Sequence, residues 1–143
     1  YDAPGVDVYL NAGGTRTPVD AAVLEARTHQ LQFVHKFPKE INPATWEVMI
    51  REQCDAMGIT PNDVDHYVFT QLNINSIHET LDALGVARER AHTVMDRFGY
   101  TGSACIPMAF HDLVKSGRPE RGDLVFFVAS GGGLSFAIAA FRL

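Results

Sequence analysis

Helical and strand-like segments alternate along this chain, and this alternation restricts its possible folds more than any other feature. Three helix-like segments end at Gly58, Gly85 and Gly117, and a short polar loop and a strand-length segment follow each of them. Strands that are separated by single helices run parallel and are joined by right-handed crossovers. The pattern therefore predicts an α/β fold in which helices cover both faces of a sheet.

The helices are predicted from apolar residues at helical spacing and from their end signals. The first is expected at 43–57, with Asn42 as N-cap and Pro43 at the first helical position. The second is expected at 74–84 and the third at 102–116, each closed by a glycine.

Strands are expected at 29–37, 67–69, 91–95, 124–129 and 134–143. The last two are separated by little more than Ser130 and a run of glycines, so they are predicted to form an antiparallel hairpin. The predicted order is β-α-β-α-β-α-β-β in a mixed sheet. A further strand-like segment stands at 6–10, before a stretch of uncertain structure.

Composition excludes several classes of function. The net charge is −5, from 12 basic and 17 acidic residues, so the chain has no basic footprint for nucleic acid. No apolar run reaches the ~18 residues that a membrane span needs. The two cysteines form no CxxC and the six histidines no HxH or HExxH, which argues against a metal site and favours a reducing cytoplasm.

From residue 65 onward the chain resembles the C-terminal half of the ketoacyl-acyl-carrier-protein synthase III branch of the condensing enzymes, which have the thiolase fold. Four stretches in order carry the resemblance: Thr70-Gln71-Leu72-Asn73-Ile74, Asp96-Arg97-Phe98-Gly99-Tyr100-Thr101, Ser103-Ala104-Cys105-Ile106-Pro107, and Arg121-Gly122-Asp123-Leu124-Val125 leading into Gly131-Gly132-Gly133. The resemblance implies that residues 1–28 end a preceding thiolase-like half and that residues 29–143 form the C-terminal half.

The resemblance also implies where the site lies. Thr70 stands at the family's histidine and Tyr100 at its asparagine, and these two are the candidate catalytic positions. Threonine cannot act as a base near pH 7, and the tyrosine phenol has an ordinary pKa of about 10, so decarboxylative condensation is expected to be crippled. The candidate substrate-binding residues are Gln71, Asn73, Gly131, Gly132 and Gly133.

Structural interpretations stand beside these functional ones. Asn73 is also a plain N-cap for the helix that follows it. The glycine run is either a structural turn or the floor of the site, with a positive φ or a close backbone approach. Cys54 and Cys105 match no family nucleophile and are interpreted as core thiols. The family's catalytic cysteine is expected in a separate N-terminal segment.

The function implied is that of an acyltransferase of the synthase III type with an altered triad, a transferase of fatty acid or polyketide biosynthesis. Its substrates would be thioesters of acyl carrier protein or coenzyme A, and no cofactor or metal is expected. Its partner would be the N-terminal half or a companion chain, in a cytoplasmic homo- or heterodimer. The alternatives are a catalytically silent partner subunit or pseudoenzyme, and a free-standing binding module. Tyr100, Thr70 and Gly132 are expected to share one pocket at the carboxyl ends of the strands.

Overall fold

The computed structural model describes residues 8–9, 12–30, 32–33, 38–132 and 134–143. Its contacts divide the chain into two units, Tyr1–Pro38 and Lys39–Leu143. In the first unit β1 (Val8–Tyr9) pairs antiparallel with β2 (Gln32–Phe33). The helix α1 (Ala21–Ala26) begins at Asp20, whose side chain accepts a hydrogen bond from the Val23 amide at 2.8 Å.

The strand predicted at 6–10 is therefore confirmed at its described residues, Val8–Tyr9, and the rest of it lies outside the described residues. Of the strand predicted at 29–37, Gln32–Phe33 forms a strand that pairs with β1. The start of the prediction is wrong, because His29 and Gln30 lie in the turn after α1, where the Gln30 amide donates to the Arg27 carbonyl at 3.1 Å. Residues 31 and 34–37 lie outside the described residues. The predicted division of the chain after residue 28 stays a prediction.

The second unit holds the three predicted helices and the strands predicted at 67–69, 124–129 and 134–143. Its longer elements are α2 (Ile41–Met57), β3 (His66–Phe69), α3 (Ile74–Leu84), α4 (Met95–Phe98), α5 (Cys105–Lys115), β4 (Leu124–Gly131) and β5 (Ser135–Arg142). Short 3₁₀ turns lie at Pro61–Asp63, Arg88–Arg90 and Gly102–Ala104. No helix in the described part of the chain is long and apolar enough to cross a membrane.

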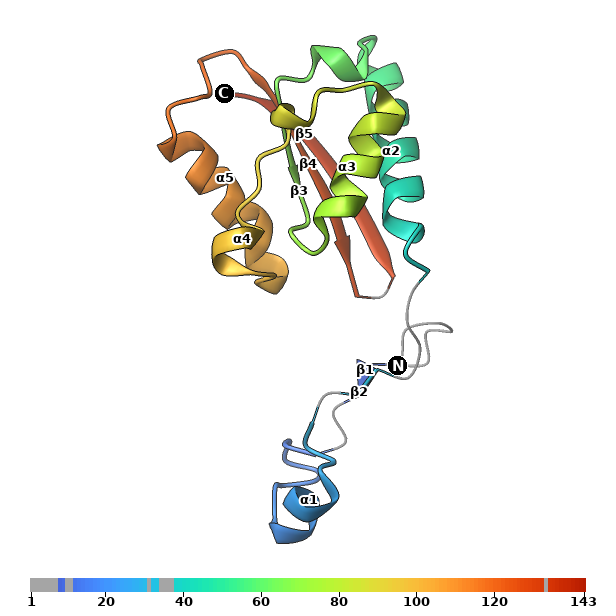
Figure 1. Cartoon of the computed structure of the whole chain (residues 1–143), viewed down its shortest axis with the longest axis vertical. Coiled ribbons are helices and arrows are strands. Elements are labelled where there is room, and N and C mark those ends of the chain that lie inside the picture. The colour runs from blue at the N-terminus through green and yellow to red at the C-terminus, as the bar shows by residue number, and fades with distance from the viewer. Residues whose placement is uncertain (1–7, 10–11, 31, 34–37, 133) are drawn as a thin grey trace. The chain divides into compact units, whose positions relative to one another are not determined.

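The sheet of the second unit has the order β3-β4-β5. β3 runs parallel to β4, with His66 opposite Val125 and Phe69 opposite Val128. β5 runs antiparallel to β4 along its whole length, which confirms the predicted hairpin. Figure 1 shows α2 and α3 on one side of these strands and α5 on the other. The predicted α/β class, with a mixed sheet between helices, is confirmed.

Alternate residues of the strands enter two separate cores. Toward α2 and α3, the buried cluster includes Tyr67, Phe69 and Phe126 with Trp46 from α2. Toward α5, Val68 and Val125 pack with Ala109 and Leu113. This period of two is the pattern of strands that are buried on both faces.

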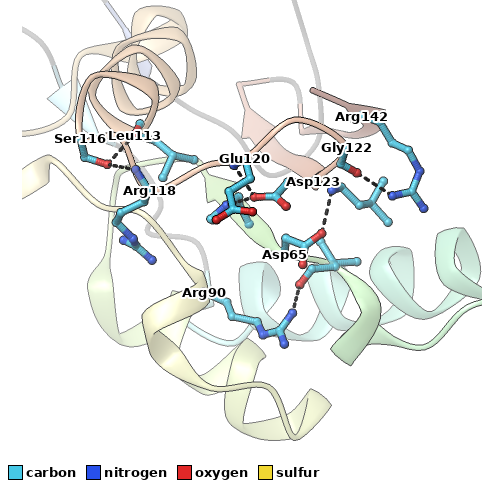
Figure 2. Close-up of polar contacts among 12 residues, drawn as sticks. Asp65, Arg90, Leu113, Ser116, Arg118, Glu120, Gly122, Asp123 and Arg142 are labelled. Carbon is cyan, nitrogen blue, oxygen red and sulfur yellow. Dashed lines mark hydrogen bonds and ion pairs between the residues drawn. The ribbon is translucent and has the colours of Figure 1, made fainter.

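At the amino ends of β3 and β4, two carboxylates accept hydrogen bonds from backbone amides. Asp65 accepts from the Leu124 amide at 2.8 Å, and Asp123 accepts from the Glu120 amide at 2.8 Å (Figure 2). Arg142 donates to the Gly122 carbonyl at 2.9 Å. The backbone N–H and C=O groups around the start of these strands therefore find hydrogen-bond partners within the protein.

The strand predicted at 91–95 is wrong. Ala91 makes a single bridge to Tyr67, and Met95 already belongs to the short helix α4. The reason is that the Val94 amide, which would continue a ladder, donates instead to the side chain of Gln71 at 2.8 Å. A side chain has taken the place of strand pairing.

The predicted start of the first helix is also wrong. The helix begins at Ile41 with Glu40 as N-cap, so Asn42 is inside it and Pro43 is its third residue. The helix tolerates Pro43 there because the first four amides of a helix have no intrahelical partner, so proline removes no bond.

We predict that Leu81→Ala lowers the free energy of unfolding by about 2–5 kcal/mol, because Leu81 is fully buried in the α2–α3 core and its truncation leaves a cavity. Denaturant titration of the intact protein measures this loss. Leu72→Ala is the matched control, since Leu72 is exposed and should cost far less. Equal losses in the two variants would contradict the packing described.

Candidate functional site

The carboxyl ends of β3 and β4 are tied together by Thr70. Its amide donates to the Val128 carbonyl at 3.0 Å. Its buried hydroxyl donates to the Ser130 carbonyl at 3.2 Å and accepts from the Ser130 amide at 2.9 Å. A threonine hydroxyl has a single proton to donate, so in this geometry that proton is committed to the protein.

A cavity of about 440 Å³ opens beside this junction. It is lined by Thr70, Tyr100, Gly102, Ser103, Cys105, Ile106, Ala129, Ser130, Gly131, Gly132, Ser135, Phe136 and Ala137. The lining comes from three places: the end of β3, the turn and helix start at 100–106, and the β4–β5 hairpin. The structure thus brings Thr70, Tyr100, Gly131 and Gly132 to one cavity, as the strand order predicts.

Tyr100 reaches the cavity from a turn that two glycines shape. Gly99 has φ 65° and ψ −159°, and Gly102 has φ 60°, backbone conformations that favour glycine. Tyr100 is 49% exposed, and its hydroxyl has no hydrogen-bond partner among the described residues. The phenol therefore stands at the open side of the cavity.

Two other predicted residues do not line the cavity. Gln71 is fully buried, with its amide bonded to protein groups. Asn73 is exposed and caps α3, because its side chain accepts from the Asn75 amide at 3.0 Å. The capping interpretation of Asn73 is confirmed, while substrate contacts of either residue stay a prediction.

The glycines of the hairpin differ from expectation in their backbone. Neither Gly131 nor Gly132 has a positive φ, and a Cβ at either would meet nothing within 4 Å. Gly133 lies outside the described residues. The physical effect of the two described glycines is to leave cavity space that a side chain would occupy.

Cys105 is a lining residue that sequence reasoning missed. It is buried, as expected, but it faces the cavity at the start of α5, and its sulfur accepts from the Gln71 amide at 3.5 Å. The available signal was its place five residues after Tyr100, at the start of a helix. Cys54 lies in the α2–α3 core, where burial, and then Asp55 and Asp63, raise the pKa of its thiol.

A cluster of charged side chains on α4, α5 and the segment before α4 does not line the cavity. Asp112 on α5 pairs with Arg97 Nη2 at 2.6 Å and with His92 Nε2 at 2.8 Å. The hydrogen bond from Arg97, and then the one from His92, lower the pKa of Asp112 to about 2. The described lining contains no histidine, carboxylate or lysine.

Among the described residues, no group of three or more His, Cys, Asp or Glu side chains could hold a metal ion.

Comparison with known proteins places the chain in one family. The family model described as 3-Oxoacyl-[acyl-carrier-protein (ACP)] synthase III C terminal matches residues 54–143. The beta-ketoacyl-[acyl-carrier-protein] synthase III of Caldanaerobacter subterraneus subsp. tengcongensis is 30% identical over 143 residues, covering 96% of this chain and 42% of that protein. The chain spans about two fifths of the length of the curated relatives it matches.

Solved structures agree. A beta-ketoacyl-[acyl carrier protein] synthase III from Thermus thermophilus matches with a TM-score of 0.74 and 30% identity, over 80% of this chain and 36% of that one. The 3-oxoacyl-(acyl carrier protein) synthase III from Pseudomonas aeruginosa matches with a TM-score of 0.76 over 96% of this chain and 43% of that one. At 20% identity the latter shows the fold alone. The predicted thiolase-like fold is confirmed.

We predict that Asp112→Asn destabilises the protein at neutral pH and less so in acid. The folded-state pKa of Asp112, about 2, lies below the ordinary value of 3.8, so its ionised form stabilises the fold above 3.8 and that contribution is lost as the pH falls toward 2. Thermal melts of variant and wild type at about pH 7 and about pH 3 measure the difference. Asp55→Asn, an exposed change on α2, is the control. A deficit that does not shrink in acid would show that the ion pair is not its cause.

Proposed function

The chain belongs to the 3-oxoacyl-[acyl-carrier-protein] synthase III family, and from this premise we propose that it builds one wall of an acyl-thioester pocket in an acyl-transferring protein. One observation carries the proposal: Thr70, Tyr100 and the hairpin glycines, far apart in sequence, line one cavity. The cavity lies at the carboxyl ends of the strands, where α/β sheets bind ligands. The lining mixes hydroxyls with apolar side chains, which suits a short acyl group and a polar thioester.

The chemistry proposed is acyl transfer without efficient decarboxylation. A thiolate attacks the thioester carbonyl carbon, a new thioester forms, and the thiol of coenzyme A or of the carrier protein leaves. The resemblance puts the attacking cysteine in a separate N-terminal segment. Thr70 and Tyr100 replace the histidine and asparagine that would polarise a second thioester, and the described lining offers no histidine or carboxylate in their place.

The partners follow from this role. The substrates proposed are thioesters of acyl carrier protein or coenzyme A, which require no cofactor. The pocket would be completed by the N-terminal half of the same protein or by a companion chain, in a homo- or heterodimer.

A second candidate is a catalytically silent partner subunit. It is favoured by the Thr70 hydroxyl, whose proton is already given to the Ser130 carbonyl. Thr70, which stands where the family's histidine acts as an acid or base, would then have the role of joining β3 to β4. The two candidates differ in whether the protein forms an acyl-enzyme.

We predict that the intact protein, incubated with acetyl-coenzyme A, gains one acetyl group and releases coenzyme A in equal amount. Intact-mass spectrometry and a thiol assay measure the two products. Peptide mapping then identifies the acylated cysteine, which we expect outside the 143 residues of this sequence. Absence of both products would favour the silent subunit. Acylation of Cys105 or Cys54 would contradict the assignment of the nucleophile to another segment.

We predict that Thr70→His combined with Tyr100→Asn raises decarboxylation of a malonyl thioester by about 10²–10⁴-fold, the usual contribution of a positioned acid or base. The cavity beside Thr70 has room for the larger ring. Loss of malonyl-coenzyme A and release of carbon dioxide measure the gain. Thr70→Val with Tyr100→Phe is the matched control, since it changes both positions without adding a titrating group. Equal rates in the two double variants would mean that these positions do not face the reacting group.

A further inference from the structure

A fully buried glutamine stands directly behind the cavity. Gln71 Nε2 donates to the Phe69 carbonyl at 2.9 Å and to the His92 carbonyl at 3.3 Å. Gln71 Oε1 accepts from the Val94 amide at 2.8 Å. Because its amide is buried and bonded on both ends, the donors and the acceptor of this side chain are used by protein groups.

These bonds replace a strand. The segment after Arg90 approaches β3 through one bridge, Tyr67 to Ala91, and the His92 amide donates to the Tyr67 carbonyl at 2.9 Å. Beyond Ala91 the backbone of this segment no longer pairs with that of β3. The side-chain amide of Gln71 instead bonds to both, to Phe69 on one side and to His92 and Val94 on the other. A primary amide offers the same donor and acceptor as a peptide group, so it continues the link by one further step.

Gln71 also contacts the third wall of the cavity. Its backbone amide donates to the sulfur of Cys105 at 3.5 Å, and Cys105 begins α5. Gln71 therefore joins three segments, and each contributes a lining residue: Thr70 from β3, Tyr100 from the turn after α4, and Cys105 from α5.

The link to Tyr100 runs through α4. Val94 is the N-cap of α4, and its carbonyl accepts from the amides of Arg97 and Phe98 at 3.1 and 3.0 Å. The chain leaves this single helical turn at Gly99 and enters the cavity wall at Tyr100. A shift of Val94 is thus carried to Tyr100 through one short, hydrogen-bonded turn.

We infer that Gln71 is a positioning residue, which holds the Tyr100 turn and the start of α5 at the distance that sets the width of the pocket. Its side chain acts on the Tyr100 turn through Val94, and its backbone amide, which any residue at this position except proline keeps, holds Cys105. What the pocket binds rests on the proposed function, but the role of Gln71 in shaping it does not. Removing the amide would leave two buried carbonyls and one buried N–H without partners, which favours local opening.

The test uses the two cysteines as internal reporters in the intact protein. Cys105 lines the pocket and is 3% exposed, whereas Cys54 lies in the α2–α3 core and is 1% exposed. In Gln71→Met, which keeps the length but loses the side-chain amide, alkylation of Cys105 by iodoacetamide should quicken at least about tenfold, because three hydrogen bonds are lost. Alkylation of Cys54 should stay at the wild-type rate. Peptide mass spectrometry follows both rates.

Thr80→Val is the matched control. The Thr80 hydroxyl is fully buried and donates to the Ser76 carbonyl at 2.8 Å within α3, away from the cavity. It should leave the ratio of the two alkylation rates unchanged. If Gln71→Met accelerated the alkylation of both cysteines equally, the role of Gln71 would be general stability of the fold. If it accelerated neither, the side-chain hydrogen bonds of Gln71 would not position the pocket. Both results overturn the inference.

Two further measurements keep the inference falsifiable if Gln71→Met does not fold. Hydrogen exchange in the wild type should protect the Val94 amide as strongly as the amides of β3, and a fast-exchanging Val94 amide would overturn the inference. Binding of acetyl-coenzyme A separates this claim from the proposed function. If wild type does not bind it, the proposed function fails while the alkylation ratio still tests Gln71. If wild type binds it, Gln71→Met should weaken binding and Thr80→Val should not.

Discussion

The parallel pairing of β3 with β4 is the constraint on which the rest of the second unit depends. Parallel strands end at the same edge of a sheet, so the register of Phe69 with Val128 puts Thr70 beside Ser130. It also requires a long connection between the strands, which α3, α4 and α5 provide. β5 then returns antiparallel to β4, and the turn between them forms another wall of the cavity.

This pairing is held by different side chains on its two faces. Toward α2 and α3, Trp46 lies 5.2 Å from Phe69 and Tyr67 lies 5.8 Å from Phe126, centre to centre. Toward α5, Phe127 makes edge-on contacts with Phe110 and Phe141. Aromatic pairs of this kind bury large areas in fixed relative orientations. The strand ends that carry the cavity therefore project from a rigid base, and the glycine-flanked Tyr100 turn has far fewer such contacts.

Much of this arrangement could be predicted from the sequence because its signals are local. The continuous apolar run of β4, the helical spacing in α3 with Asn73 and Gly85 at its ends, and the short hairpin connection are each determined by neighbouring residues. The shared cavity followed from the rule for strand ends. The failures involve long-range partners. The segment at 91–95 has strand-like residues, but its pairing is completed by the Gln71 side chain, and no local pattern shows that a side chain has this role.

What the cavity can do chemically depends on which of its side chains still have a free hydrogen-bond donor. Thr70 has one hydroxyl proton and has given it to Ser130, so it could assist a substrate carbonyl only by breaking the bond that joins β3 to β4. Of the lining residues, Tyr100 has the phenol, and none of the residues that the structure describes accepts a hydrogen bond from it. Half of that residue is in solvent, where water competes for the same proton and a hydrogen bond to substrate adds little. Tyr100 becomes an effective donor when something excludes water from the mouth of the cavity, since hydrogen bonds strengthen as the local dielectric falls. The strength of Tyr100 as a donor therefore depends on whether water is excluded from the cavity.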